Sequence, residues 1–128
     1  MTRDVALIVG GGPGISASCA RLFARSGMHV GVAARNPDKE PAAVELLFQN
    51  VVRDLGSPTL VVHNIDGRVA GIFRKGIIEA DADMALETLR GSAFSAFLVG
   101  QQAARLMLEN EPSANGAKGT IIFTNASA

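Results

Sequence analysis

The chain has 128 residues, 48% of them hydrophobic, and its 12 basic residues balance 12 acidic ones, so neither nucleic acid nor an anionic membrane is an expected partner. A single cysteine excludes an internal disulfide framework and fits a reducing compartment. No apolar run reaches membrane-spanning length and the N-terminus has no signal-peptide plan, so we expect a cytoplasmic protein with one domain over residues 1–128.

Short apolar runs alternate with amphipathic segments along the chain. The runs are typical of strands, and the spacing i, i+3, i+4, i+7 of apolar residues after Pro41 is typical of a helix. Strands and helices in alternation predict a parallel sheet covered on both faces, an α/β fold. In chain order, the expected strands are Val5–Val9, His29–Ala34, Thr59–His63 and Thr120–Thr124, and the expected helices are Ile15–Ser26, Pro41–Leu55, Asp81–Leu89 and Ser92–Asn110.

A glycine-rich turn, Gly10-Gly-Gly-Pro-Gly-Ile-Ser16, lies between the first strand and the first helix. Glycines let the backbone approach phosphates, and the unpaired N–H groups and dipole at a helix start favour an anion. The turn therefore predicts a site for a nucleotide pyrophosphate, with a tight turn that holds no ligand as the alternative. The residues expected to bind this cofactor are Gly10, Gly12, Pro13, Gly14 and Ile15.

The end of the second strand discriminates between cofactors. A carboxylate there would bind the adenosine ribose of NAD, but the sequence is Ala33-Ala34-Arg35-Asn36. Arg35 follows Gly14 by 21 residues, and its guanidinium is suited to a 2′-phosphate. We therefore expect NADP(H), the alternative being that Arg35 is a solvated loop residue.

Two motifs near the predicted strand ends have a recognisable form. Gly10, Gly14 and Ile15 fit the pattern Gly-x-x-x-Gly-Ile-Gly, although Ser16 stands at its last glycine. The segment His63-Asn64-Ile65-Asp66 fits Asn-Asn-Ala-Gly only at Asn64.

Two further segments continue the same order of motifs. The helix pattern Asn-x-x-Gly-x-Phe-x-x-x-Gln keeps Phe97 and Gln101 but has Ser92 at its asparagine. The last strand, Gly119–Thr124, is similar to a fifth strand that leads to a catalytic serine. From Ala6 to the final residue, the chain thus resembles the short-chain dehydrogenase/reductase family.

The resemblance implies a Rossmann-type doubly wound sheet, and its NADP-preferring members agree with the expectation at Arg35. It implies that Asn64 and Ile65 line the nicotinamide side, and that Asp66 brings a carboxylate near the cofactor where the family has glycine. It puts Ser92 at the catalytic asparagine position. The catalytic serine falls on Ala126, or on Ser127 if the loop shifts by one residue.

The family's proton-transferring tyrosine and lysine are not found in the chain, which contains no tyrosine. The resemblance also implies a further helix–strand unit, about 20 to 25 residues long, where Lys39 meets Glu40. Its absence would leave a bare sheet edge that could template aggregation. We therefore expect a longer protein with segments absent here between Lys39 and Glu40 and after Ala128; a natural minimal domain is the alternative.

Other residues have less distinctive interpretations. Cys19 is expected to be a buried packing residue, and neither His29 nor His63 has a partner at metal-ligand spacing, so no metal is expected. Phe94 and Phe97, with Leu98 and Ala104, are expected to share one helix face. In the resembled family that helix packs against a second subunit, which implies a homodimer or homotetramer.

The function expected from these observations is NADP(H)-dependent hydride transfer to or from a small-molecule substrate with a carbonyl or hydroxyl group. Two alternatives stay open. One is a relative that binds a dinucleotide, or nothing, and has lost the catalytic groups. The other is a divergent enoyl reductase, because Gly10 followed by five residues and Ser16 also resembles that branch.

Overall fold

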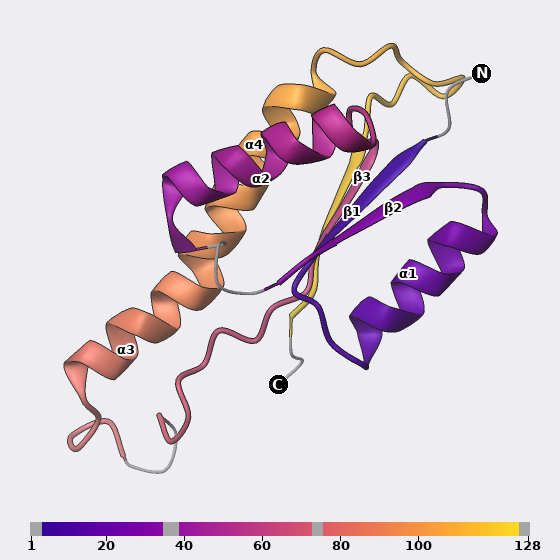
Figure 1. Cartoon of the computed structure of the whole chain (residues 1–128). Helices are drawn as coiled ribbons and strands as arrows, with labels where there is room; N and C mark the ends of the chain where they lie inside the picture. The colour runs from indigo at the N-terminus through magenta and orange to yellow at the C-terminus, as the bar shows by residue number, and fades with distance from the viewer. Residues whose placement is uncertain (1–3, 35–38, 73–75, 126–128) are drawn as a thin grey trace.

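A computed structural model describes residues 4–34, 39–72 and 76–125 of the chain (Figure 1). The described strands pair in one parallel sheet in the order β2-β1-β3-β4. The strands are β1 (Val5–Val9), β2 (His29–Ala33), β3 (Leu60–His63) and β4 (Thr120–Phe123). The helices are α1 (Ile15–Arg25), α2 (Pro41–Asp54), α3 (Ala82–Leu89) and α4 (Ser95–Met107), with a π-helical segment, η2 (Arg90–Phe94), between the last two.

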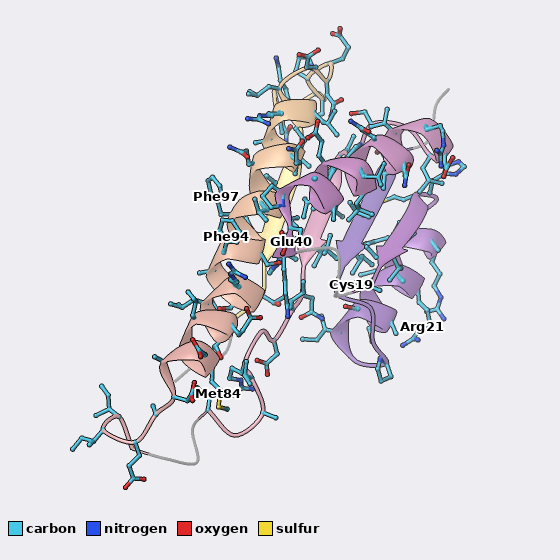
Figure 2. All side chains as sticks on the ribbon, turned by 60° about the vertical axis from the view of Figure 1, so that its left-hand side comes forward. Cys19, Arg21, Glu40, Met84, Phe94 and Phe97 are labelled. Atoms are coloured by element: carbon cyan, nitrogen blue, oxygen red, sulfur yellow. The ribbon has the colours of Figure 1, made fainter. Side chains whose placement is uncertain are left out.

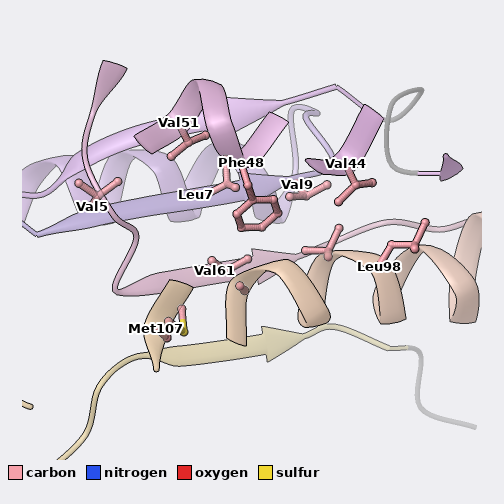
Figure 3. Packing of buried hydrophobic residues seen from close by; sticks show 11 residues of the cluster. Val5, Leu7, Val9, Val44, Phe48, Val51, Val61, Leu98 and Met107 are labelled. Carbon is pink, nitrogen blue, oxygen red and sulfur yellow. The ribbon is translucent and has the colours of Figure 1, made fainter. Parts of the chain in front are cut away.

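Helices cover both faces of this sheet, as the sequence predicted. In Figure 1, α1 lies on one side, while α2 and α4 lie together on the other. Between them and the sheet, Phe48 of α2 packs among Leu7, Val9 and Val61 (Figure 3). All five residues of β1 are buried, so the first strand forms the centre of the core. The predicted α/β architecture is therefore confirmed.

Two details of the helices differ from the prediction. The expected helices Asp81–Leu89 and Ser92–Asn110 are joined without a break, because η2 continues the helical backbone through Gly91. Leu98 is buried in the core and does not share the exposed face of Phe94, Phe97 and Ala104. The rotation per residue explains this, since α4 turns Leu98 toward the sheet and Phe97, one position earlier, toward solvent.

Cys19 in α1 also differs from the prediction of a buried packing residue, because it is only partly buried. Helix α1 covers only the β1–β2 part of its face of the sheet. The layer around Cys19 is therefore open on one side. No helix in the described part of the chain is long and apolar enough to span a membrane.

The strand order identifies where a ligand would bind in such a sheet. In the doubly wound order 3-2-1-4-5-6, these strands occupy positions 2-1-4-5, and no strand lies beyond β2 among the described residues. The chain passes outward from β1 to β2 and then returns to the other side of β1 with β3. The switch point is therefore between β1 and β3, and ligands of open parallel sheets bind outside the carboxyl ends at such a point.

Candidate functional site

A hollow of about 220 Å³ lies at this switch point. It is formed by the turn that follows β1, the first residues of α1 and the loop that follows β3. The residues that line it are Gly10, Gly11, Gly12, Gly14, Ile15, Ser16, Asn64 and Asp66. Because four of these residues are glycines, much of the surface of the hollow is backbone.

The start of the glycine turn is shaped by the chain's own packing. Gly10 has φ +107°, and a Cβ there would lie 2.1 Å from the carbonyl oxygen of Asn64. The backbone N–H groups of Gly10 and Gly11 both donate to the carbonyl oxygen of Ala33, at 2.9 and 3.0 Å. The turn is thereby held between the ends of β2 and β3, and Gly10 is required by the fold itself.

Gly12 and Gly14 are different, because the chain's own packing does not explain them. No heavy atom would lie within 4 Å of a Cβ at either position. Gly14 is the N-cap of α1 and provides no side-chain cap, which leaves the first N–H groups of the helix to be satisfied from outside. Open space above small residues at a helix start is the arrangement that admits an anion.

A chain of hydrogen bonds connects the ends of β1, β3 and β4 beside the hollow. The Ser16 hydroxyl, whose residue is 2% exposed, donates to the carbonyl oxygen of Gly10 and accepts from the Asn64 amide at 2.9 Å. The Asn64 side-chain oxygen in turn accepts from the Thr124 hydroxyl at 2.8 Å. Ser16 thus holds the turn against Asn64, a role that the motif's usual glycine could not perform.

A second buried pair lies below this network. His63 Nε2 and the Ser95 hydroxyl are 2.9 Å apart, and both residues are almost fully buried. The His63 ring also lies 6.1 Å from that of Phe123. These contacts join the carboxyl ends of β3 and β4 to the first turn of α4, so His63 supports the site from within the protein.

The structure brings together five of the residues predicted to bind a cofactor, and two others lie apart. Pro13 is exposed beside the hollow and does not line it, and Ile65 packs against the core and the Cβ position of Gly10. Arg35 and Ser127 lie outside the described residues. The five residues that line the hollow are Gly10, Gly12, Gly14, Ile15 and Asn64.

Ser92, predicted at the catalytic asparagine position, lies in η2. Its hydroxyl donates to the carbonyl oxygen of Thr88 at 2.6 Å. The segment is held against the loop after β3, since a Cβ at Gly67 would lie 2.1 Å from the carbonyl carbon of Gly91. Ser92 therefore lies next to the loop that carries Asp66, outside the hollow itself.

Sequence reasoning missed two features of this loop. The guanidinium of Arg68 binds both carboxylate oxygens of Asp66, and Gly67 is in backbone contact with Gly91. The spacing Asp-x-Arg was a local signal for the first contact. No local signal existed for the second, because residues 67 and 91 belong to separate segments.

An exposed ion pair between two neighbouring residues lies on α2, away from the hollow. Arg53 donates to both carboxylate oxygens of Asp54, at 2.8 and 3.1 Å, and this hydrogen bonding holds the pKa of Asp54 below its usual range. Within the ranges that the structure describes, no three His, Cys, Asp or Glu residues are grouped to hold a metal ion.

No protein-family model matches the sequence, and no curated protein does. Solved structures do match in fold. The short-chain dehydrogenase/reductase from Serratia marcescens is 22% identical, with a TM-score of 0.73 over 95% of this chain and 57% of that one. The ligand-free aldohexose dehydrogenase from Thermoplasma acidophilum is 15% identical, with a TM-score of 0.74 over 95% of this chain and 49% of that one. The chain thus spans about half the length of these enzymes, and the predicted resemblance is confirmed at the level of fold.

Proposed function

Because the chain has the fold of the short-chain dehydrogenases/reductases, we propose that it is the dinucleotide-binding part of an oxidoreductase. The observation that carries this proposal is the open space above Gly12 and Gly14 at the start of α1. The chain's own packing requires a glycine at neither position, whereas a pyrophosphate approaching the backbone would. Gly10, Gly12, Gly14 and Ile15 would hold the pyrophosphate, with Asn64 on the nicotinamide side of the hollow.

The bound cofactor would supply or accept the hydride. The groups of this chain bind and orient it: the turn is fixed by the two hydrogen bonds to Ala33, and Asn64 is fixed by Ser16 and Thr124. The proposed substrate is a small molecule with a carbonyl or hydroxyl group. We propose that the tyrosine and lysine that transfer the substrate's proton belong to a longer protein, and that Ser127 is the catalytic serine that acts with them.

A pair of glycine variants tests the binding proposal. Gly76, like Gly12, has no heavy atom within 4 Å of its Cβ position, so alanine is sterically accommodated at both. Isothermal titration with NADPH should show at least about tenfold weaker binding for Gly12→Ala. Gly76→Ala should bind like the unaltered chain. Equal affinity of all three proteins would refute the proposed cradle.

The preferred cofactor is NADP(H). Support comes from the sequence at the tip of β2, Ala33-Ala34-Arg35-Asn36, which has an arginine and no carboxylate, and from the Ala33 bonds that tie the end of β2 to the glycine turn. Arg35→Ala should weaken NADPH binding far more than NADH binding, because only NADPH carries the 2′-phosphate. Equal losses for the two cofactors in calorimetry would reject this role.

One observation favours a second candidate, a dinucleotide-binding protein without catalytic activity. The Ser92 hydroxyl donates into its own helix, to Thr88, so its proton is already engaged where the family has an asparagine amide. This candidate would bind NADPH as tightly as the proposed oxidoreductase but would transfer no hydride. NADPH oxidation measured with a panel of aldehydes and ketones separates the two, provided that it is run on the longer protein that would carry the tyrosine and lysine and that this protein is already known to bind NADPH.

We also propose that the chain forms a homodimer or homotetramer through the outer face of α4. Phe97 of α4 and Phe94, the last residue of η2, lie beside one another with ring centroids 6.4 Å apart, and both point away from the sheet (Figure 2). Phe97 is 57% exposed and Leu108, further along the same helical region, is 69% exposed. Large apolar side chains grouped on one face are typical of a protein–protein contact.

A further inference from the structure

Asp66 introduces a negative charge where the proposed ligand is itself an anion. Asp66 lines the same hollow as Gly12 and Gly14. Among the described residues that line the hollow, Asp66 is the charged one. A carboxylate in this position repels a pyrophosphate, and the low polarity of a protein surface strengthens the repulsion relative to water. A positive charge paired with Asp66 would therefore strengthen the binding of a dinucleotide in this hollow.

The loop itself explains why an aspartate stands here. The side-chain oxygen Oδ1 of Asp66 accepts the backbone N–H of Arg68 at 3.2 Å, which closes a tight turn around Gly67. Gly67 is pressed against Gly91 so closely that no Cβ would fit. Asp66 thus shapes the loop that must pass between the hollow and η2.

Arg68 supplies the compensation. Its Nε donates to Oδ1 and Oδ2 of Asp66 at 2.7 and 3.0 Å, and a terminal nitrogen also donates to Oδ2. This hydrogen bonding raises the pKa of Arg68 further from its ordinary value, and a guanidinium is charged at neutral pH even without that shift. Both side chains are more than half exposed, so the pair adds little to folding stability. Its main effect is on the charge at the edge of the hollow.

We propose that Asp66 and Arg68 form a charge-compensating pair that tunes how tightly the hollow binds a diphosphate. The inference rests on the proposed function and adds a specificity-determining element to it. Asp66 shapes the loop, and Arg68 is a positioning residue that acts on the ligand through Asp66. With Arg68 in place the Asp66 carboxylate at the edge of the hollow is paired with a guanidinium, and in Arg68→Gln this positive charge is lost from the edge.

The test compares Arg68→Gln, Asp66→Asn and the double variant in the full chain. Asparagine keeps the oxygen that accepts the Arg68 N–H, so the loop turn is retained. Isothermal titration with NADPH is run at about 0.05 M and about 0.3 M salt, which screens exposed charges strongly only at the higher concentration. Arg68→Gln should bind about fivefold more weakly at low salt and less than about twofold more weakly at high salt. The double variant should return to within about twofold of the unaltered chain.

Two results would overturn the inference. One is an Arg68→Gln variant that binds NADPH as tightly as the unaltered chain. The other is a double variant as weak as Arg68→Gln, which would mean that Arg68 acts on the ligand directly. A circular dichroism melt of each variant shows whether the fold is intact.

Inorganic pyrophosphate separates this inference from the proposed function. If the unaltered chain binds neither NADPH nor NADH, the proposed function fails. The pair is then judged by titrating the same variants with inorganic pyrophosphate. The same ranking of affinities supports charge compensation, whereas equal affinities, or no binding by any protein, reject it.

Discussion

Gly10→Ala should destabilise the fold strongly, while the same change at Gly12 should not. The new Cβ at residue 10 would lie 2.1 Å from the Asn64 oxygen and 2.8 Å from Cγ1 of Ile65. The Asn64 oxygen belongs to the backbone, and the Asn64 N–H donates to the carbonyl oxygen of Val9 at 2.9 Å. The Asn64 backbone therefore cannot move away without weakening this hydrogen bond. Alanine would also have to adopt the φ of +107° that Gly10 has, a conformation that favours glycine, or the turn would have to change its backbone conformation.

The size of the effect follows from these two costs. A non-glycine residue at such a φ costs about 1–3 kcal/mol, and a displaced Asn64 weakens one or two hydrogen bonds by about 1 kcal/mol each. We expect the free energy of unfolding to fall by about 3 kcal/mol. Against a typical total of about 5–15 kcal/mol this is a large fraction, and it lowers the Tm by about 10 °C.

Urea unfolding followed by circular dichroism is the appropriate assay, because the chain has no tryptophan or tyrosine to report by fluorescence. The urea midpoint should fall by about 1–3 M for Gly10→Ala. For Gly12→Ala, where no atom lies within 4 Å, the free energy of unfolding should change by less than about 1 kcal/mol. A Gly10→Ala variant within about 1 kcal/mol of the unaltered chain, or equal losses at both positions, would refute the reasoning.

Three other variants test separate contacts. Ser16→Ala leaves the half-buried Asn64 amide without the Ser16 acceptor, so the free energy of unfolding should fall by about 1–3 kcal/mol in urea, whereas the exposed Ser18→Ala should change it little. Phe97→Glu should shift the chain toward monomer in sedimentation equilibrium, and an unchanged association state would contradict the proposed α4 contact. Because the folded pKa of Asp54 is lowered from 3.8, its contribution to stability is present above that value and is lost as the pH falls through the folded pKa. Because both side chains are more than half exposed, solvent screens the pair, and Asp54→Asn should flatten acid unfolding only slightly in this window. An unchanged acid profile would show that Arg53 does not stabilise the charged form.

The sequence predicted the elements well where the signals were local. Apolar runs predicted all of the described strands to within one residue at each end, and Pro41 predicted the first residue of α2. The joined helices were missed because Gly91 and Ser92 resemble a boundary. In the folded protein Gly91 is in contact with Gly67, and the helical backbone continues through it.

The candidate site was predictable in part for the same reason. The turn from Gly10 to Ile15 is one continuous segment between a strand and a helix, so its place at a carboxyl edge followed from the order of elements. Its partner Asn64 could be named only through the resemblance. The bonds that Asn64 makes to Ser16 and Thr124 span 48 and 60 residues, and no local pattern encodes them.

The amino-acid sequence by itself determined which segments become strands and helices, and where a backbone-lined turn precedes a helix. These properties depend on side-chain periodicity and backbone conformation within a few residues. Only the tertiary structure decided which glycine is required by packing and which leaves open space, and that Ser16 joins the turn to Asn64. Those distinctions depend on atoms brought together from separate segments, because a distance between segments is set by how the whole sheet packs.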